Sequence, residues 1–85
     1  MTKTQQKILG AVSREYEWAT KHRHWPADLI HAAAKVAEET GELIQACNDV
    51  CYPGEARTIG SDERMRVEAL HVIVTAIRFL EGLER

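Results

Sequence analysis

The chain has 85 residues, of which 45% are hydrophobic and 28% are charged, and its formal net charge is -2. This length excludes barrels and doubly wound nucleotide folds, which need about 200 residues or more, and the hydrophobic content excludes a disordered tail. The balance of 11 basic and 13 acidic residues argues against a nucleic-acid binder and a membrane-surface module, so we expect one small globular domain over residues 1–85.

The first predicted element is a helix from about Thr4 to Thr20. Apolar side chains recur in it at spacings of three and four residues: Ile8, Leu9, Val12, Tyr16 and Ala19. The opening segment MTKTQQKILG has no long apolar run after its lysines, and no stretch approaches the ~18 apolar residues of a membrane span. We therefore expect a cytoplasmic protein without a signal peptide.

The second predicted helix runs from about Asp28 to Val50. Pro26 disfavours helix at Trp25, and Asp28 is a suitable N-cap. The predicted apolar face comprises Leu29, Ala32, Ala33, Val36, Leu43, Cys47 and Val50. Cys47 and Cys51 are four residues apart on this helix, a poor geometry for a disulfide, and we interpret them as buried free thiols.

The third predicted helix begins with Ser61 or Asp62 as its cap and runs to about Leu83. It is apolar on two sides, so most of its surface must be buried. A chain of this size buries about 60–65% of its unfolded surface, which makes a monomer marginal. We therefore predict an all-α fold with three main helices per chain, the second and third forming a four-helix-bundle core in a homodimer or tetramer.

Acidic residues on the second helix and a polar strip on the third point to a metal site. Glu39 and Glu42 are one turn apart and lie close to the apolar face, and carboxylates on one rigid face are ligands for hard cations. On the third helix, Glu68 and His71 are also one turn apart, within a narrow polar strip flanked by apolar residues. These four residues are the predicted metal ligands.

The two motifs, EETGE at residues 38–42 and EALH at residues 68–71, resemble those of the MazG-like all-α NTP pyrophosphatase family. The family signature is Glu-Glu-x-x-Glu followed on the next helix by Glu-x-x-Asp, and the resemblance covers roughly residues 32–80. It implies that Glu39, Glu42 and Glu68 bind Mg²⁺, with His71 in the place of the family's Asp. It also implies that Glu38 is a supporting carboxylate or activates water, which makes Glu38 and Glu39 the candidate catalytic residues.

The activity implied by the resemblance is hydrolysis of a nucleoside triphosphate, in particular a dNTP, to the monophosphate and pyrophosphate, as in house-cleaning of the nucleotide pool. Lys35 and Arg78 are placed to meet phosphate oxygens, and Trp25 is a candidate for stacking on the base. Imidazole is a poor Mg²⁺ ligand and a better one for Mn²⁺. Three outcomes are consistent with His71: a preference for Mn²⁺, metal binding by the three carboxylates alone, or an impaired site.

Two other functions compete with this hypothesis. Glu-x-x-His on one helix facing a Glu on another is also the ligand pattern of di-iron and di-manganese carboxylate bundles, and a homodimer would supply the second copy. Alternatively, with His in place of Asp, the chain is a degenerate relative that binds nucleotides without turnover or forms a helical interaction module.

Overall fold

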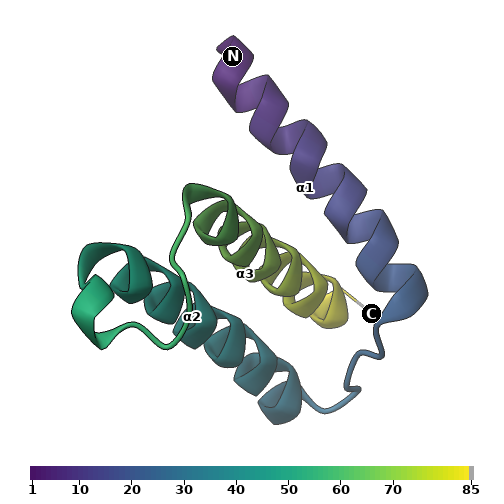
Figure 1. Cartoon of the computed structure of the whole chain (residues 1–85). Coiled ribbons are helices and arrows are strands. Elements are labelled where there is room, and N and C mark those ends of the chain that lie inside the picture. Colours follow the sequence, from purple (N-terminus) through teal and green to yellow (C-terminus); the bar gives the residue numbers. More distant parts are fainter. Residues whose placement is uncertain (85) are drawn as a thin grey trace.

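The computed structural model describes residues 1–84, which form three long helices: α1 (Lys3–His22), α2 (Leu29–Cys51) and α3 (Asp62–Leu83) (Figure 1). A short 3-10 turn, η1 (Pro53–Glu55), follows α2. The predicted all-α class is confirmed, since no strand occurs between residues 1 and 84. The predicted helix limits differ from the observed ones by no more than two residues.

Each long helix begins at a side-chain cap that the sequence provides. Thr2 and Gln5 form a capping box, in which the Thr2 hydroxyl accepts from the Gln5 amide at 3.0 Å and Gln5 accepts from the Thr2 amide at 2.8 Å. Asp28 accepts from the Ile30 amide at 2.7 Å, and Ser61 accepts from the Arg64 amide at 3.1 Å. These bonds satisfy amide groups that have no partner within the helix, and they fix where α2 and α3 start.

The helices do not form a compact bundle. α3 packs along α2 and also contacts α1, whereas the N-terminal half of α1 extends away from the other two helices (Figure 1). The radius of gyration is 14.3 Å, compared with about 12 Å for a compact domain of this length. The single chain therefore leaves part of α1 and one side of the α2–α3 pair without a packing partner.

The small core lies where the second half of α1 meets α3. Val12, Ala19 and Val74 are buried there, with Tyr16 and two further α3 side chains packed around them. The Tyr16 hydroxyl donates to the Glu81 carboxylate at 2.6 Å and ties the two helices together; this bond raises the pKa of Tyr16. The predicted apolar stripe of α1 is only half covered, because Ile8 and Leu9 are about half exposed.

The face that α2 buries differs from the predicted one. Ala32 and Ala46 are buried, but Leu29 and Val50 are 43% and 36% exposed, and the acidic Asp49 is buried instead. The predicted apolar face therefore extends too far towards both ends of the helix. Leu29 and Val50 lie at the two ends of α2, where the single chain covers the helix only partly. The two cysteines, predicted to be buried, are half-buried at Cys47 and exposed at Cys51.

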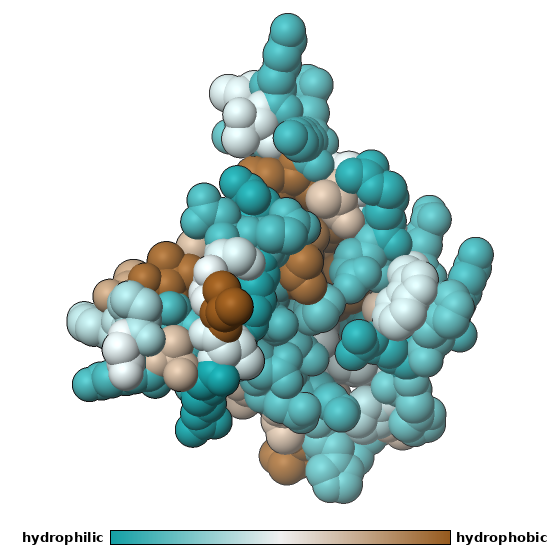
Figure 2. All heavy atoms as spheres, in the orientation of Figure 1, coloured by the Kyte–Doolittle hydropathy of each residue, from teal (hydrophilic) through white to brown (hydrophobic). Residues whose placement is uncertain are grey.

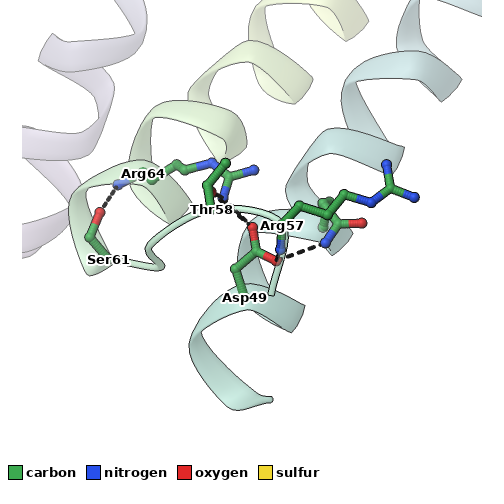
Figure 3. A network of polar contacts seen from close by, with 6 residues as sticks. Asp49, Arg57, Thr58, Ser61 and Arg64 are labelled. Atoms are coloured by element: carbon green, nitrogen blue, oxygen red, sulfur yellow. Dashed lines mark hydrogen bonds and ion pairs between the residues drawn. The ribbon is translucent and has the colours of Figure 1, made fainter. Parts of the chain in front are cut away.

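Asp49 is buried because the loop after α2 closes over it (Figure 3). Its carboxylate accepts hydrogen bonds from the Gln45 side chain at 2.8 Å, the Arg57 amide at 3.1 Å and the Thr58 hydroxyl at 3.1 Å, and it forms an ion pair with Arg64. The Arg64 guanidinium, helped by the other donors, holds the pKa of Asp49 well below its usual range. Asp49 thus fastens the loop and the start of α3 to the end of α2.

Exposed hydrophobic side chains remain on the surface of the chain. On the face shown in Figure 2, most of the surface is hydrophilic, and hydrophobic side chains gather between α1 and α3 and near the end of α2. A groove between α1 and α3 is lined by Ile8, Leu70 and Ile73 among others. None of the helices within residues 1–84 has both the length and the apolar character required to cross a membrane.

Candidate functional site

The four predicted metal ligands lie together between α2 and α3. One side-chain donor atom from each of Glu39, Glu42, Glu68 and His71 lies within 4.8 Å of the other three. Spacings of three residues place each pair on one face of its helix, and the packing of α3 along α2 brings the two pairs opposite each other. Three carboxylates and one imidazole therefore surround a common point.

The cluster contains two oxygen atoms that lack a partner. Glu39 Oε2 and Glu68 Oε2 are buried, and neither has a hydrogen-bond partner among the described residues. His71 Nδ1 lies 3.6 Å from the first and 3.7 Å from the second, which is too far for a hydrogen bond. Unsatisfied buried carboxylate oxygens are costly, so this arrangement calls for a cation or a proton between them.

The donor spacing fits a divalent cation. Two ligands at about 2.1 Å from an ion are about 3.0 Å apart at a right angle and about 3.4 Å apart at a tetrahedral angle. His71 Nδ1 lies 3.6 and 3.7 Å from the two carboxylate oxygens, and the four donors as a set lie within 4.8 Å of one another, so the cluster would contract slightly around an ion. The donor set of carboxylates and an imidazole suits Mn²⁺ and later first-row metals, and suits Mg²⁺ through its carboxylates.

The electrostatics of the cluster also favour a bound cation. Burial raises the pKa of the Glu39 carboxyl, and the neighbouring Glu42 raises it further. The side chain of Glu39 is 13% exposed, so its charge is poorly solvated in the protein without metal. A cation at the centre of the cluster would offset both the desolvation and the repulsion between carboxylates.

Sequence interpretation missed a fifth member of this cluster. Glu15 of α1 places Oε1 2.9 Å from Nε2 of His71, on the side of the ring opposite Glu39 and Glu68. No spacing rule connects a residue of the first helix with one of the third, so this contact depends on how α1 crosses α3. The sequence offers one indication of this contact: Glu15 directly precedes Tyr16, which belongs to the apolar stripe of α1, so its side chain lies near the buried face of the helix.

Beside the cluster lies a pocket of about 290 Å³ that brings acidic and basic side chains together. Its lining includes two glutamates, Glu15 and Glu39, together with His71. The other polar and aromatic residues of the lining are Arg23, His24, Trp25, Lys35, Thr75 and Arg78. The three predicted substrate-binding residues, Lys35, Arg78 and Trp25, thus line the same pocket as two of the predicted ligands.

Arg78 is held in this pocket by the end of α1. Its guanidinium donates to the carbonyls of Arg23 at 3.2 Å and Ala19 at 3.4 Å, and it lies 4.8 Å from the centre of the Trp25 ring. An arginine on the last carbonyls of a helix is favourable for the helix dipole. Arg78 therefore organises the connection between α1 and α2 and presents a positive charge to the pocket.

Glu38, the other predicted catalytic carboxylate, lies outside the cluster of four. Its side chain is 58% exposed, and Oε2 lies 3.9 Å from Nζ of Lys35. Both residues line a neighbouring shallow hollow that opens to solvent. The structure therefore separates Glu38 from the ligands, while Lys35 borders both the hollow and the main pocket.

Comparisons of the chain with protein-family models, with curated proteins and with solved structures find no match. The resemblance to MazG-like pyrophosphatases therefore rests on the two motifs and stays a prediction.

Proposed function

We propose that this chain is a metal-dependent hydrolase that converts a nucleoside triphosphate, in particular a dNTP, to the monophosphate and pyrophosphate. The supporting observation is the pocket of about 290 Å³. Two of the predicted metal ligands, Glu39 and His71, line it together with the basic side chains of Lys35 and Arg78 and the ring of Trp25. A triphosphate needs both features, because cations must neutralise its charge and direct a water to one phosphorus.

In the proposed reaction, a water oxygen bonds to the α-phosphorus, the bond from that phosphorus to the α–β bridging oxygen breaks, and pyrophosphate leaves. Glu39, Glu42, Glu68 and His71 hold the cation, which supplies charge neutralisation and a more acidic water when it is bound. Arg78 and Lys35 meet phosphate oxygens, and Trp25 offers its ring to the base. Glu38 is the candidate acceptor of the water's proton, because its carboxylate is neither one of the four metal donors nor bonded to His71, and it lies beside Lys35, which borders the pocket.

Pyrophosphate release from a panel of NTPs and dNTPs, with Mg²⁺ or Mn²⁺, tests this function. Activity should be abolished in Glu39→Gln together with metal binding, measured by titration calorimetry. In Glu38→Gln activity should be lost while metal binding is kept, because Glu38 lies outside the cluster. Arg66→Gln is a matched surface control that should behave as the wild type. Absence of pyrophosphate from every nucleotide with either metal would refute the proposal.

The mixed donor set also supports a second candidate, a di-iron or di-manganese carboxylate centre. Each chain supplies Glu68-x-x-His71 and the facing Glu39, so a symmetric pair of chains would supply two such sets. This function predicts oxygen-dependent oxidation of added Fe²⁺ with a visible absorption band, and no pyrophosphate release. Nucleotide binding without either reaction would instead identify a degenerate binding module.

We further propose that the working protein is a homo-oligomer in which α2 and α3 of two chains form a four-helix core. Along α2, Ile30, Ala37, Ile44 and Cys51 are spaced by seven residues, and all four are exposed in the single chain. Apolar residues that recur at every seventh position are typical of a helix that packs against another helix. Beside this stripe, a Cβ added at Gly41 would meet nothing within 4 Å, so the chain itself leaves that space open.

Sedimentation of the wild type and two variants tests the oligomer. Ile44→Glu places a charge in the stripe and should shift the protein towards the monomer. Ile59→Glu is the control, because Ile59 is 94% exposed on the loop and lies away from α2's stripe. Equal sedimentation of all three proteins at micromolar concentration would contradict a core built on this face.

A further inference from the structure

Glu15 is the one carboxylate at the site that comes from α1, and it contacts His71 rather than the other carboxylates. Its Oε1 atom lies 2.9 Å from His71 Nε2, and the two side chains are 24% and 19% exposed. A carboxylate oxygen and an unprotonated ring nitrogen would repel each other at this distance, since both carry lone pairs. Nε2 must therefore carry a proton.

With the proton on Nε2, the other ring nitrogen of a neutral imidazole has a free lone pair. That nitrogen, Nδ1, faces Glu39 Oε2 at 3.6 Å and Glu68 Oε2 at 3.7 Å. Both of these oxygens are buried and have no hydrogen-bond partner in residues 1–84. Three atoms that can each donate an electron pair, His71 Nδ1 and the two glutamate oxygens, thus lie close together. Glu15 contacts the opposite nitrogen of the same imidazole ring.

We propose that Glu15 is a positioning residue that sets the tautomer of His71, so that Nδ1 is a metal ligand and the site selects Mn²⁺ or a later first-row ion over Mg²⁺. This inference rests on the metal site of the proposed function and deepens it by naming the class of ion. His71 then supplies a nitrogen ligand beside the three carboxylates of the cluster.

The chemistry of the two ions supports this selection. Mg²⁺ is held by oxygen ligands and dehydrates reluctantly, whereas imidazole binds Mn²⁺ and the ions beyond it in the first row increasingly well. A carboxylate on the far nitrogen of a ligating histidine fixes the ring and raises its basicity, and its loss costs about 10- to 100-fold in metal affinity. Loss of Glu15 should therefore weaken the ions that use Nδ1 and leave an oxygen-only ion nearly unaffected.

Titration calorimetry with Mn²⁺ and with Mg²⁺, without nucleotide, tests the selection. In Glu15→Ala the affinity for Mn²⁺ should fall about 10- to 100-fold, and the affinity for Mg²⁺ should change much less. Glu15→Gln keeps an oxygen acceptor opposite Nε2 and should retain most of the Mn²⁺ affinity. Glu17→Ala, an exposed glutamate on the same helix, is the matched control for net charge. Equal losses for both ions in Glu15→Ala would overturn the proposal.

The tautomer can be read directly from two-bond ¹⁵N–¹H correlation spectra of the metal-free protein, recorded at a pH high enough that the ring signals no longer change with pH. The His71 ring, identified by its absence from His71→Gln, should show the proton on Nε2 in the wild type and in Glu15→Gln. Glu15→Ala should show a mixture. A proton on Nδ1 in the wild type would overturn the inference.

These measurements separate the two levels of the hypothesis. Neither experiment contains a nucleotide, so a correct tautomer and Mn²⁺ selectivity without pyrophosphate release would refute the proposed hydrolase and keep the role of Glu15. Pyrophosphate release with unchanged Mn²⁺ affinity in Glu15→Ala would refute the role of Glu15 and keep the hydrolase.

Discussion

The guanidinium of Arg78 covers the ring of Trp25 at 4.8 Å while donating to two carbonyls at the end of α1. One side chain of α3 thus holds both the last turn of α1 and the connection that leads into α2. The position of the Arg78 guanidinium and the position of the Trp25 ring are therefore coupled, so a substitution of Arg78 should alter the environment of Trp25.

Arg78→Lys should reveal this coupling, because an ammonium cannot reach both carbonyls and cover the ring with one planar group. The free energy of unfolding should fall by about 1 kcal/mol, the usual size of a lost hydrogen bond. Urea unfolding followed by tryptophan fluorescence measures it, and the native emission should shift to longer wavelength as Trp25 becomes more solvated. Arg66→Lys, on the exposed side of α3, is the control; identical curves for both variants would contradict the coupling.

Metal binding should stabilise the fold strongly. An ion present at about 100 times its Kd adds about 2.7 kcal/mol to the free energy of unfolding. For a domain of this size that raises Tm by about 10–20 °C, measured by thermal unfolding with and without Mn²⁺. Glu68→Gln should abolish this shift, and its metal-free Tm should equal or exceed that of the wild type because one of the facing carboxylates loses its charge.

Glu63→Gln is the matched control for that experiment, since Glu63 is on the same helix with a side chain 78% exposed. It should keep the full Mn²⁺ shift. A wild-type Tm that does not respond to Mn²⁺, or a metal-free Glu68→Gln variant that is clearly less stable, would argue that the carboxylates form a structural network that requires no cation.

The buried Asp49 predicts a pH dependence of stability. Its pKa is lowered in the folded protein, so its contribution is complete above the ordinary aspartate pKa of about 3.9 and is lost as the pH falls below it towards the folded value. Asp49→Asn should lower Tm at neutral pH, and the difference from the wild type should narrow below about pH 4. Thermal unfolding between neutral pH and pH 3 measures this difference.

Arg64→Gln removes the same ion pair from the other side, so its Tm difference from the wild type should narrow over the same range. A difference that stays constant down to pH 3 in both variants would show that the Asp49–Arg64 pair does not stabilise the protein. The pair matters for the site because Arg64 belongs to the first turn of α3, the helix that carries Glu68 and His71.

Gly60 is required by the close approach of the loop to α2. A Cβ at this position would lie 2.6 Å from the Asp49 carbonyl carbon and the Val50 amide nitrogen, both of which are backbone atoms. Gly60→Ala should therefore destabilise the protein by about 1–3 kcal/mol, as in overpacking. In Gly54→Ala the Cβ meets nothing within 4 Å, so a change within about 0.5 kcal/mol is expected from the same denaturation measurement. Equal effects of the two variants would contradict this packing.

Local signals in the sequence were sufficient for the helices. Pro26 with Asp28, and Pro53 with Ser61, mark the ends of α2 and the start of α3 within two residues, because caps and prolines act on their immediate neighbours. The four clustered donors were also predictable, since a spacing of three residues determines a helix face wherever the helix lies. The angle at which one helix crosses another is not encoded by any such local spacing in the sequence.

The residues that the sequence did not reveal depend on these crossings. Asp49 follows the pattern of a solvated acidic residue, and its burial results from a loop that folds back to bring Arg57, Thr58 and Arg64 onto it. Glu15 is one of several charged residues on α1, and its meeting with His71 results from the angle between α1 and α3. The exposure of Ile8 and Leu9 has the same origin, because α1 diverges from α3 towards its N-terminus.

The loose attachment of α1 has a thermodynamic consequence. Because α1 rests on α3 through a small core and places Glu15 against His71, the docking of this helix would be coupled to cation binding at the proposed site. At the proposed metal site, a cation that fixes His71 and Glu15 should slow hydrogen exchange in the part of α1 that contacts α3. A change that loosens this contact should lower the affinity for the cation by the same free energy. Hydrogen exchange in the C-terminal half of α1, which packs on α3, would then report binding at a site formed mainly by the other two helices.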